Sequence, residues 1–318
     1  MQGQSRIAVV KRFFGNQSIL LILVLLVVVM SFLSDSFLTL GNLFNIARQV
    51  AVLGIIACGM TIVIIAGLID LSVGSILSLV MAVMIRMQGY GYAASLFAGL
   101  ACGAICGLIN GILIGRYRAN FFMATLSTMF LYQGITLLVD GGYNLKGSRD
   151  LPYTFIGQSN ILGIPAMIYV LIPLALLSAL LLRKTPFGRR LYAVGLNSRA
   201  AFAAGVNTSA VTLLAYVISG IACGAGGIVL VSRLTMAQPA AGAPYLFDIV
   251  TAVILGGTSM SGGFGSIYKT VIGFILLGVI NNGMALLGVP FEYQQMVKGL
   301  IFIFAVVYDE FMKRKRLS

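Results

Sequence analysis

The residues with the clearest chemical potential surround one carboxylate in an otherwise apolar stretch. Asp70 stands between two apolar runs and is followed by Ser72, Gly74 and Ser75. A carboxylate is costly inside a membrane, so such a residue usually has a functional reason to be there. In one interpretation, Asp70 and the two serines line a path for a polar solute where a helix is interrupted. In the other, which is compatible with the first, Asp70 caps the helix starting at Leu71–Ser72 by meeting its free backbone N–H groups.

A glycine-rich segment in the second half of the chain resembles this first one. Residues 257–267 read GTSMSGGFGSI and echo residues 67–76, and a second weak echo links 107–111 to 278–281. Short apolar segments broken by glycine at matching places in two halves point to a substrate path lined by interrupted helices. The predicted path residues are therefore Asp70, Ser72, Gly74, Ser75, Thr258 and Ser261.

The same glycine-rich segment contains a Ser-Gly-Gly sequence, at residues 261–263, that resembles the signature of ATP-binding-cassette ATPases. The chain lacks the GxxxxGK[ST] loop that would cradle the phosphates. It also has no polar region large enough for an ATPase domain. We therefore interpret the glycines as a tight turn between spans and expect this chain to bind no cofactor of its own.

The longest purely basic segment lies in the middle of the chain, at residues 183–210. It holds five of the 21 basic residues and no acidic one. Pro186 and Gly188 are expected to open it as a turn. Asn197 is a candidate N-cap for a short alanine-rich helix over 199–204, and Gly205 is its expected stop. A short helix presented by a membrane protein in this way is typical of a docking element for a partner protein.

Composition places the chain among polytopic membrane proteins. It has 318 residues, of which 59% are hydrophobic and 9% charged, with a mean hydropathy of +1.03. Soluble domains carry about 25% charged residues. The net charge of +13 reflects the basic bias of cytosolic membrane loops rather than nucleic-acid binding. The chain has no His, and its four Cys lie in apolar runs without further ligands, so no metal site is expected.

Charge and hydropathy together predict about ten transmembrane helices in an all-α fold. One segment, residues 232–268, is ambiguous because its best apolar run is too short to cross a ~30 Å core. With the N-terminus inside, 15 of the 21 basic residues fall on the cytosolic side. We therefore expect one permease-like domain over residues 1–318, with 1–17, 183–209 and 309–318 in the cytosol and 140–162 outside.

Four segments carry a family resemblance over nearly the whole chain. They are GLIDLSVGS at 67–75, NGILIGRYRANFFMATLSTMFLYQGI at 110–135, FGRRLYAVGLNSRAAFAAGVN at 187–207 and DIVTAVILGGTSMSGGFGSIYKTVIGFILLGVINNGMALLGV at 248–289. In this order they resemble the permease subunits of ribose-type bacterial ABC sugar importers. Leu68, Leu196 and Phe202 depart from the commoner residues at these places, as does the segment Tyr117–Asn120. None of these departures threatens the class, and Leu68 bears on which ligand passes.

The resemblance implies a multi-pass protein of the bacterial inner membrane that works with three partners. These are a second permease copy, identical or homologous, a double-cassette ATPase that binds ATP and Mg²⁺ in the cytosol, and a sugar-binding protein outside. The segment matching 186–208 would carry the helix that docks into the ATPase, with Phe202 as an apolar anchor. The expected coupling residues are Phe187, Gly188, Arg189, Arg190, Asn197, Arg199, Ala200, Ala201, Phe202 and Gly205.

Three other classes compete with this interpretation. An ion-coupled secondary transporter of a small polar solute usually keeps several charged residues in the membrane, and here only Asp70 and Asp248 are plausible. A membrane-embedded enzyme would need paired carboxylates or a metal, which the eight scattered acidic residues do not provide. A structural membrane protein would leave the central loop unexplained. The sequence does not identify the sugar.

Overall fold

The structure is a computed structural model that describes residues 18–148 and 154–317, with side chains described as far as Phe311. It is almost entirely helical, which confirms the predicted all-α class. The helices are α2 (Ser18–Leu33), α3 (Leu40–Ile65), α4 (Val73–Arg86), α5 (Tyr92–Gly111), α6 (Phe121–Asp140), α7 (Thr154–Gln158), α8 (Ala166–Lys184), α9 (Pro186–Leu196), α10 (Ser198–Ala203), α11 (Thr208–Leu234), α12 (Ala243–Leu255), α13 (Ile267–Leu286) and α14 (Phe291–Leu317).

The sequence predicted about ten transmembrane helices, and the helices of the structure differ in whether they can span a membrane. By length and composition, seven helices in the described part of the chain can cross a membrane, and α2 and α12 are shorter apolar helices. With 13 residues, α12 extends for roughly 20 Å at 1.5 Å per residue, less than a ~30 Å hydrocarbon core. The ambiguous segment 232–268 therefore contains an interrupted helix.

The helix α3 forms the centre of the bundle. Its apolar window is 89% buried inside the protein, whereas that of α8 is only 22% buried. A helix that is apolar on all sides must be covered on all sides, while a helix with an exposed apolar face suits contact with lipid. The helices α8, α11, α12 and α13 all pack on α3, so this helix is in contact with much of the bundle.

Close glycine contacts join α5 to α11. Gly103 and Gly107 on α5 face Gly220 and Gly224 on α11, and a Cβ on Gly103 would lie 2.8 Å from the backbone nitrogen of Gly224. Small residues spaced four apart let two membrane helices approach until their backbones touch. The glycine-rich composition of this span is therefore explained by packing.

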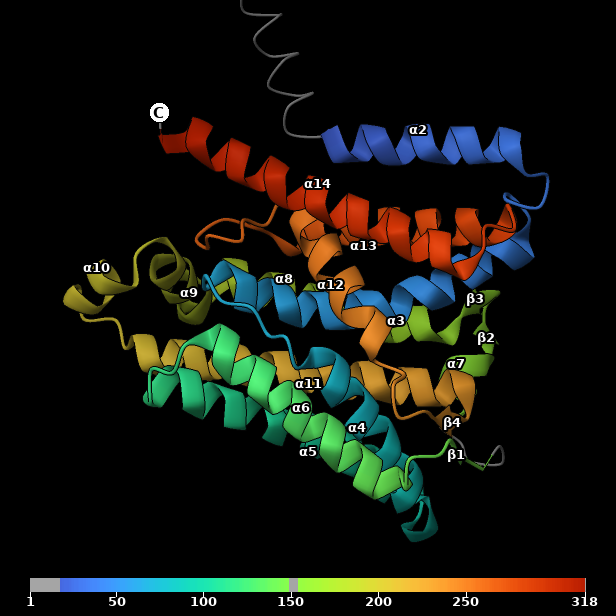
Figure 1. The fold of residues 1–318 in the computed structure, drawn as a ribbon, viewed down its shortest axis with the longest axis horizontal. Helices are drawn as coiled ribbons and strands as arrows, with labels where there is room; N and C mark the ends of the chain where they lie inside the picture. Colours follow the sequence, from blue (N-terminus) through green and yellow to red (C-terminus); the bar gives the residue numbers. More distant parts are fainter. Residues whose placement is uncertain (1–17, 149–153, 318) are drawn as a thin grey trace, which may run out of the picture.

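The two ends of the molecule are different (Figure 1). At one end α9 and α10 project, and the C-terminal end of α14 points the same way. At the other end lie two short antiparallel ladders. In these ladders β1 (Leu145–Lys146) pairs with β4 (Met236–Ala237), and β2 (Asn160–Ile161) pairs with β3 (Ile164–Pro165).

The basic central segment is more regular than its sequence indicated. The expectation of a turn at Pro186 and Gly188 is wrong, because α9 begins there, with Pro186 in its first turn and Thr185 as its N-cap. Pro fits the first helical turn, where its missing N–H is not needed. Gly188 is buried against the carbonyl of Leu182, so it permits a close approach rather than a turn.

The short helix that follows was predicted correctly. Asn197 Oδ1 accepts a hydrogen bond of 3.0 Å from the backbone N–H of Ala200, and the helix covers 198–203. Gly205 has a φ of +81° and ends it in the left-handed conformation. Asn207 then caps α11 by accepting a 3.0 Å bond from the N–H of Ala210.

Candidate functional site

Asp70 lies in the non-helical connection between α3 and α4 and has no exposed surface. Its Oδ1 accepts hydrogen bonds from the backbone N–H of Ser72 at 2.9 Å and from the Ser72 hydroxyl at 2.6 Å. Its Oδ2 is buried and has no partner among the described residues. The carboxylate therefore fixes the chain as it begins α4, close to the capping interpretation, although the N-cap position itself belongs to Ser72.

A second residue, Asn110 on α5, completes this polar cluster. Its Nδ2 donates to the Ser72 hydroxyl at 2.8 Å and to Asp70 at 3.3 Å. Its Oδ1 accepts from the Tyr132 hydroxyl at 3.4 Å, and the Tyr216 hydroxyl donates to the carbonyl of Ile69 at 3.1 Å. The connection before α4 is thus tied to α5, α6 and α11. In the sequence, Asn110 was noted only as part of the weak repeat, and its contact with Asp70 was not predicted.

The path residues are not equally accessible in this conformation. Gly74 and Ser75 are buried in the first turns of α4, and Thr258 is fully buried, whereas Ser261 is exposed. Gly74 lies against Gly242, directly before α12, so the first turns of the two short helices meet. Whether these residues line a path for solute stays a prediction.

The two glycine-broken segments of the repeat touch each other. Gly262 has a φ of +81°, and a Cβ there would lie 2.7 Å from the Cα of Gly67. The N–H of Gly263 donates to the carbonyl of Ile65, the last residue of α3, at 2.8 Å. Asp309 on α14 steadies the same turn by accepting a 2.9 Å bond from the N–H of Met260. The sequence located both breaks but did not reveal their contact, or the role of Asp309.

We call the contact of Ile65 and Gly67 with Gly262 and Gly263 the junction. The helix α9 packs directly against it. Gly195 lies against the carbonyl of Ile65, and a Cβ there would also come within 2.5 Å of the Gly263 nitrogen. The Tyr192 hydroxyl donates to the carbonyl of Gly265 at 2.9 Å. Burial raises the pKa of the Tyr192 phenol, an effect partly opposed by the positive charge of Arg183, so the donor stays protonated near neutral pH. One helix therefore contacts both breaks.

The coupling residues divide into a supporting set and an exposed set. Gly188 and Ala201 are buried within the chain, and Phe187 is half-buried. The exposed members are Arg189, Arg190, Asn197, Arg199, Ala200, Phe202 and Gly205. The expectation that Ala201 belongs to a face offered to a partner is corrected, since its side chain packs inward with only 5% exposed.

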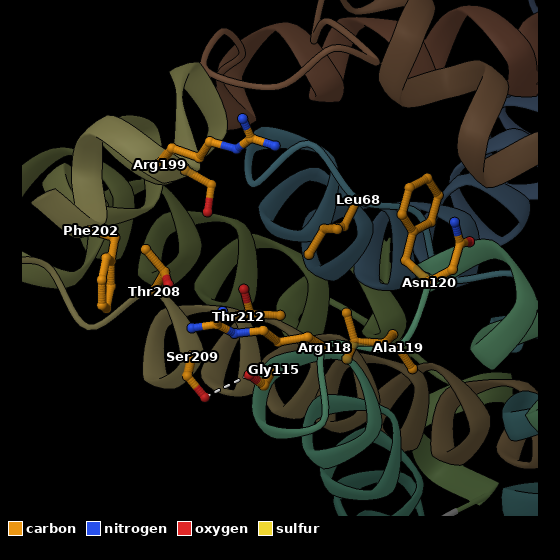
Figure 2. Close-up of a pocket in the computed structure, with 13 residues that line it drawn as sticks. Leu68, Gly115, Arg118, Ala119, Asn120, Arg199, Phe202, Thr208, Ser209 and Thr212 are labelled. Atoms are coloured by element: carbon orange, nitrogen blue, oxygen red, sulfur yellow. Dashed lines mark hydrogen bonds between the residues drawn. The ribbon is translucent and has the colours of Figure 1, made fainter.

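A cavity of about 420 Å³ lies beneath α10 (Figure 2). It is lined by Phe202 and Arg199 from the α10 side, by Arg118 and its neighbours after α5, and by Leu68. Ser209, at the start of α11, donates a 2.6 Å hydrogen bond to the carbonyl of Gly115 on its wall. The α10 helix contacts α9 and α11, while Ala200, Phe202 and Ala203 are exposed. The unusual Leu68 lies at this end of the molecule.

The described residues contain no group of three or more His, Cys, Asp or Glu side chains that could hold a metal ion. The four cysteines carry free thiols. What the described residues do show at this place is a physical link, through α9, between the exposed α10 and the two helix breaks.

Replacing Gly195 by Ala is expected to disturb this link. The new methyl group would collide with backbone atoms of Ile65 and Gly263, which cannot rotate away as a side chain could. Overpacking of this kind costs about 1–3 kcal/mol. Thermal unfolding of the purified permease should show the loss, and any transport that depends on α10 should fall.

Gly134→Ala on α6 is the matched control, because its Cβ would meet nothing within 4 Å. If Gly195→Ala behaved like this control in both stability and transport, the contact of α9 with Ile65 and Gly263 would have no functional importance.

Comparison with known proteins identifies the family of the chain. The profile of the family described as "Branched-chain amino acid transport system / permease component" matches residues 42–306. The ribose import permease protein RbsC of Bacillus subtilis (strain 168) is 42% identical over 290 residues, covering 90% of each chain. The corresponding protein of Escherichia coli (strain K12) is 38% identical over 305 residues, covering 94% of this chain and 95% of its own.

A third relative is the L-arabinose transport system permease protein AraH of Escherichia coli (strain K12), which is 32% identical over 312 residues, or 96% of this chain and 93% of its own. No solved structure matches the chain. The match to the family profile and the near-complete coverage of these relatives lead to one conclusion: this chain belongs to the family of branched-chain amino acid transport system permease components.

Proposed function

We propose that this chain is the membrane-spanning permease subunit of an ATP-driven importer for a monosaccharide. The support is the identity of 42% and 38% to two ribose import permeases over at least 90% of each chain. An arabinose permease at 32% identity widens the substrate class to pentoses and related sugars without choosing among them. Binding of the free sugar would be the task of a separate extracytoplasmic protein.

The single observation that carries a coupled mechanism is the position of α9. This helix leads to the exposed α10 and contacts both glycine-broken segments, through Gly195 and Tyr192. A force applied to α10 by a cytosolic ATPase would therefore reach the end of α3 and the turn before α13 through α9 alone. ATP and Mg²⁺ belong to that partner, and the chain itself performs no hydrolysis.

The distribution of charge and the number of docking helices support one arrangement in the membrane. With α10 in the cytosol, most of the basic residues face inward, as the positive-inside rule requires. Both termini are then cytosolic and the β1–β4 end faces out, in the bacterial inner membrane. One subunit presents one α10, so a double-cassette ATPase would engage two permeases, identical or homologous.

Reconstitution tests the proposal. Proteoliposomes holding this permease, a double-cassette ATPase and a sugar-binding protein from the same source should take up labelled D-ribose or L-arabinose only when ATP and all three proteins are present. An ATPase with its P-loop lysine replaced should abolish uptake, because that lysine contacts the phosphates.

A protonophore, which collapses a proton gradient, tests the ion-coupled alternative in the same proteoliposomes. Uptake that persists without the ATPase and disappears with the protonophore would overturn the proposal and support the ion-coupled alternative. Uptake that needs ATP and ignores the protonophore is the expected result.

A further inference from the structure

An ion pair joins α12 and α14, two helices that contribute no residue to the Asp70 cluster. Lys298 Nζ on α14 is 2.9 Å from Asp248 Oδ2 on α12, and the two side chains are 18% and 13% exposed. Asn281 Nδ2 on α13 also donates to Asp248 Oδ2, at 3.3 Å. Charged groups inside a membrane are rare and usually mark the route of a substrate or ion. The sequence offered Asp248 only as a candidate for ion coupling and gave no role to Lys298.

Two cavities flank this ion pair. One of about 510 Å³ is lined by Phe247, Thr251 and Gln295 beside the pair, and one of about 330 Å³ is lined by Gln49, Arg233 and Tyr245. Asp248, Lys298 and Pro244 belong to both. Each volume falls within the usual range of small-molecule sites, about 300–1,000 Å³. We call the two cavities and the ion pair between them the polar chamber.

The polar chamber has hydrogen-bonding capacity that the described residues do not use. Asp248 Oδ1 accepts no hydrogen bond from them, and Asn281 Oδ1 is buried without a partner. The side chains of Gln49, Arg233 and Tyr245 line the smaller cavity and form no hydrogen bond with a described residue. Buried polar groups normally find partners. This set offers carboxylate, amide, guanidinium and phenol groups to a solute rich in hydroxyl groups.

The larger cavity adds an aromatic wall. Phe247 and Phe302 line it and meet edge to face, with ring centres 5.8 Å apart at 73°. Aromatic rings provide flat apolar surface at low conformational cost. A pyranose or furanose ring has the matching character, because its C–H faces are apolar and its rim carries hydroxyls.

The chamber is well placed for a solute crossing the membrane. Pro244 and Asp248 belong to the short α12, which begins next to Gly74, where the first turns of α12 and α4 meet. Arg233 lies in the last turn of α11, which leads to β4 at the end opposite α10. Interrupted helices near the middle of the bilayer are the usual location of transport sites.

From these observations we propose that the polar chamber is a low-affinity binding site for a neutral monosaccharide in transit, with Asp248, Lys298 and Gln49 as hydrogen-bonding groups. The proposal rests on the proposed sugar import. The ion pair neutralises Lys298, and the aromatic wall suits the apolar face of a sugar ring. Arg233, which has no carboxylate partner among the described residues, would donate hydrogen bonds to the hydroxyl groups of the sugar. Low affinity follows from the small number of groups and suits release to the cytosol.

Saturation-transfer NMR on the purified permease alone, in lipid nanodiscs, tests the site without the binding protein and the ATPase. D-ribose and L-arabinose are the probes, and D-ribose 5-phosphate tests for an anion site. We expect transfer to a neutral sugar and little to the phosphate. A preference for the phosphate would overturn the proposal.

The substitution Gln49→Met distinguishes a sugar-binding role of the polar chamber from a purely structural one. Gln49 has no hydrogen bond to lose among the described residues, so a purely structural chamber should tolerate the change or gain stability. A binding role predicts unchanged thermal stability with about fivefold weaker sugar binding, the equivalent of about 1 kcal/mol for one hydrogen bond. Gln158→Met, at an exposed position outside the chamber, is the matched control.

The charge-swapped pair Asp248→Lys with Lys298→Asp examines the ion pair itself. It restores the attraction between α12 and α14 but reverses the groups offered to the sugar, so we expect a folded permease with reduced binding and uptake. If the swapped protein folds, binds sugar and imports it normally, the pair is only structural and the proposal fails.

Failure of this inference can be told apart from failure of sugar import. A reconstituted complex that imports D-ribose or L-arabinose, combined with a native permease that shows no saturation transfer, would refute the chamber alone. A complex that imports no sugar of the panel would refute the proposed function and the chamber with it.

Discussion

A Phe202→Asp permease is expected to reach the membrane at normal abundance, to lose its cytosolic ATPase and to import no sugar. Phe202 is 62% exposed at the end of α10, so the permease does not need it for its own packing. A large exposed aromatic residue on a projecting helix has the character of an interface anchor, and anchors contribute at least about 2 kcal/mol to binding. A loss of that size weakens association about 30-fold. Copurification of the ATPase and sugar uptake are the two measurements.

Two further substitutions in the same segment give this experiment its controls. Arg190→Ala removes an exposed charge and should cost about 1 kcal/mol or less. Ala201→Glu should fail in a different way, because Ala201 is 5% exposed and the carboxylate would enter the packing of the permease itself. We expect Ala201→Glu to lower permease abundance. A Phe202→Asp protein that keeps both its ATPase and its uptake would show that α10 is not the coupling element.

The contrast between Ala201 and Phe202 shows that the ends of a short helix can be predicted from the sequence, whereas its buried side cannot. The caps of α10 were predictable because Asn197 and Gly205 act on atoms within a few residues of themselves. The direction in which each alanine faces depends on neighbours from other parts of the chain. In an Ala-rich helix of 6 residues, no hydrophobic period exists to reveal the buried side.

The same limit applies to the helix breaks. Glycine and the isolated Asp70 located both of them, since each signal is local. Their mutual contact, between Gly67 and Gly262, joins residues far apart in the chain. The polar groups that complete the sites, Asn110 at Asp70 and Lys298 at Asp248, also come from distant helices. No periodicity or composition in the sequence connects them.

The membrane spans were also predictable only in part. Hydropathy predicted about ten spans, whereas seven helices of the described residues are long and apolar enough to cross a membrane. It also marked 232–268 as irregular because the apolar run was short. It could not predict that α12 begins beside α4, because that depends on the approach of Gly242 to Gly74 with no side chain between them. The N-terminal segment 1–17 and part of 140–162 lie outside the described residues, so the predictions for them stay open.

Substitutions of Asp70 are expected to have the second large effect. They distinguish a structural role of its carboxylate from a role in ion coupling. Asp70→Leu is expected to reduce the folded permease strongly. The backbone N–H and the hydroxyl of Ser72 would lose their acceptor in a fully buried place, and Asn110 Nδ2 would lose one of its two acceptors. Each donor left unsatisfied there costs about 1–3 kcal/mol. Membrane abundance and the thermal stability of the purified permease would measure the loss.

Asp70→Asn should be far milder, because the amide oxygen can replace Oδ1 as the acceptor of all three bonds. The oxygen that becomes an NH₂ group is Oδ2, which has no partner among the described residues. An ATP-driven permease should therefore keep most of its abundance and uptake with Asn at this position. A secondary transporter that moved a proton or a cation through Asp70 would lose transport at normal abundance, since an amide cannot ionise. That second outcome, together with sensitivity of the native protein to a protonophore, would make Asp70 a coupling residue and remove the case for an ATPase partner.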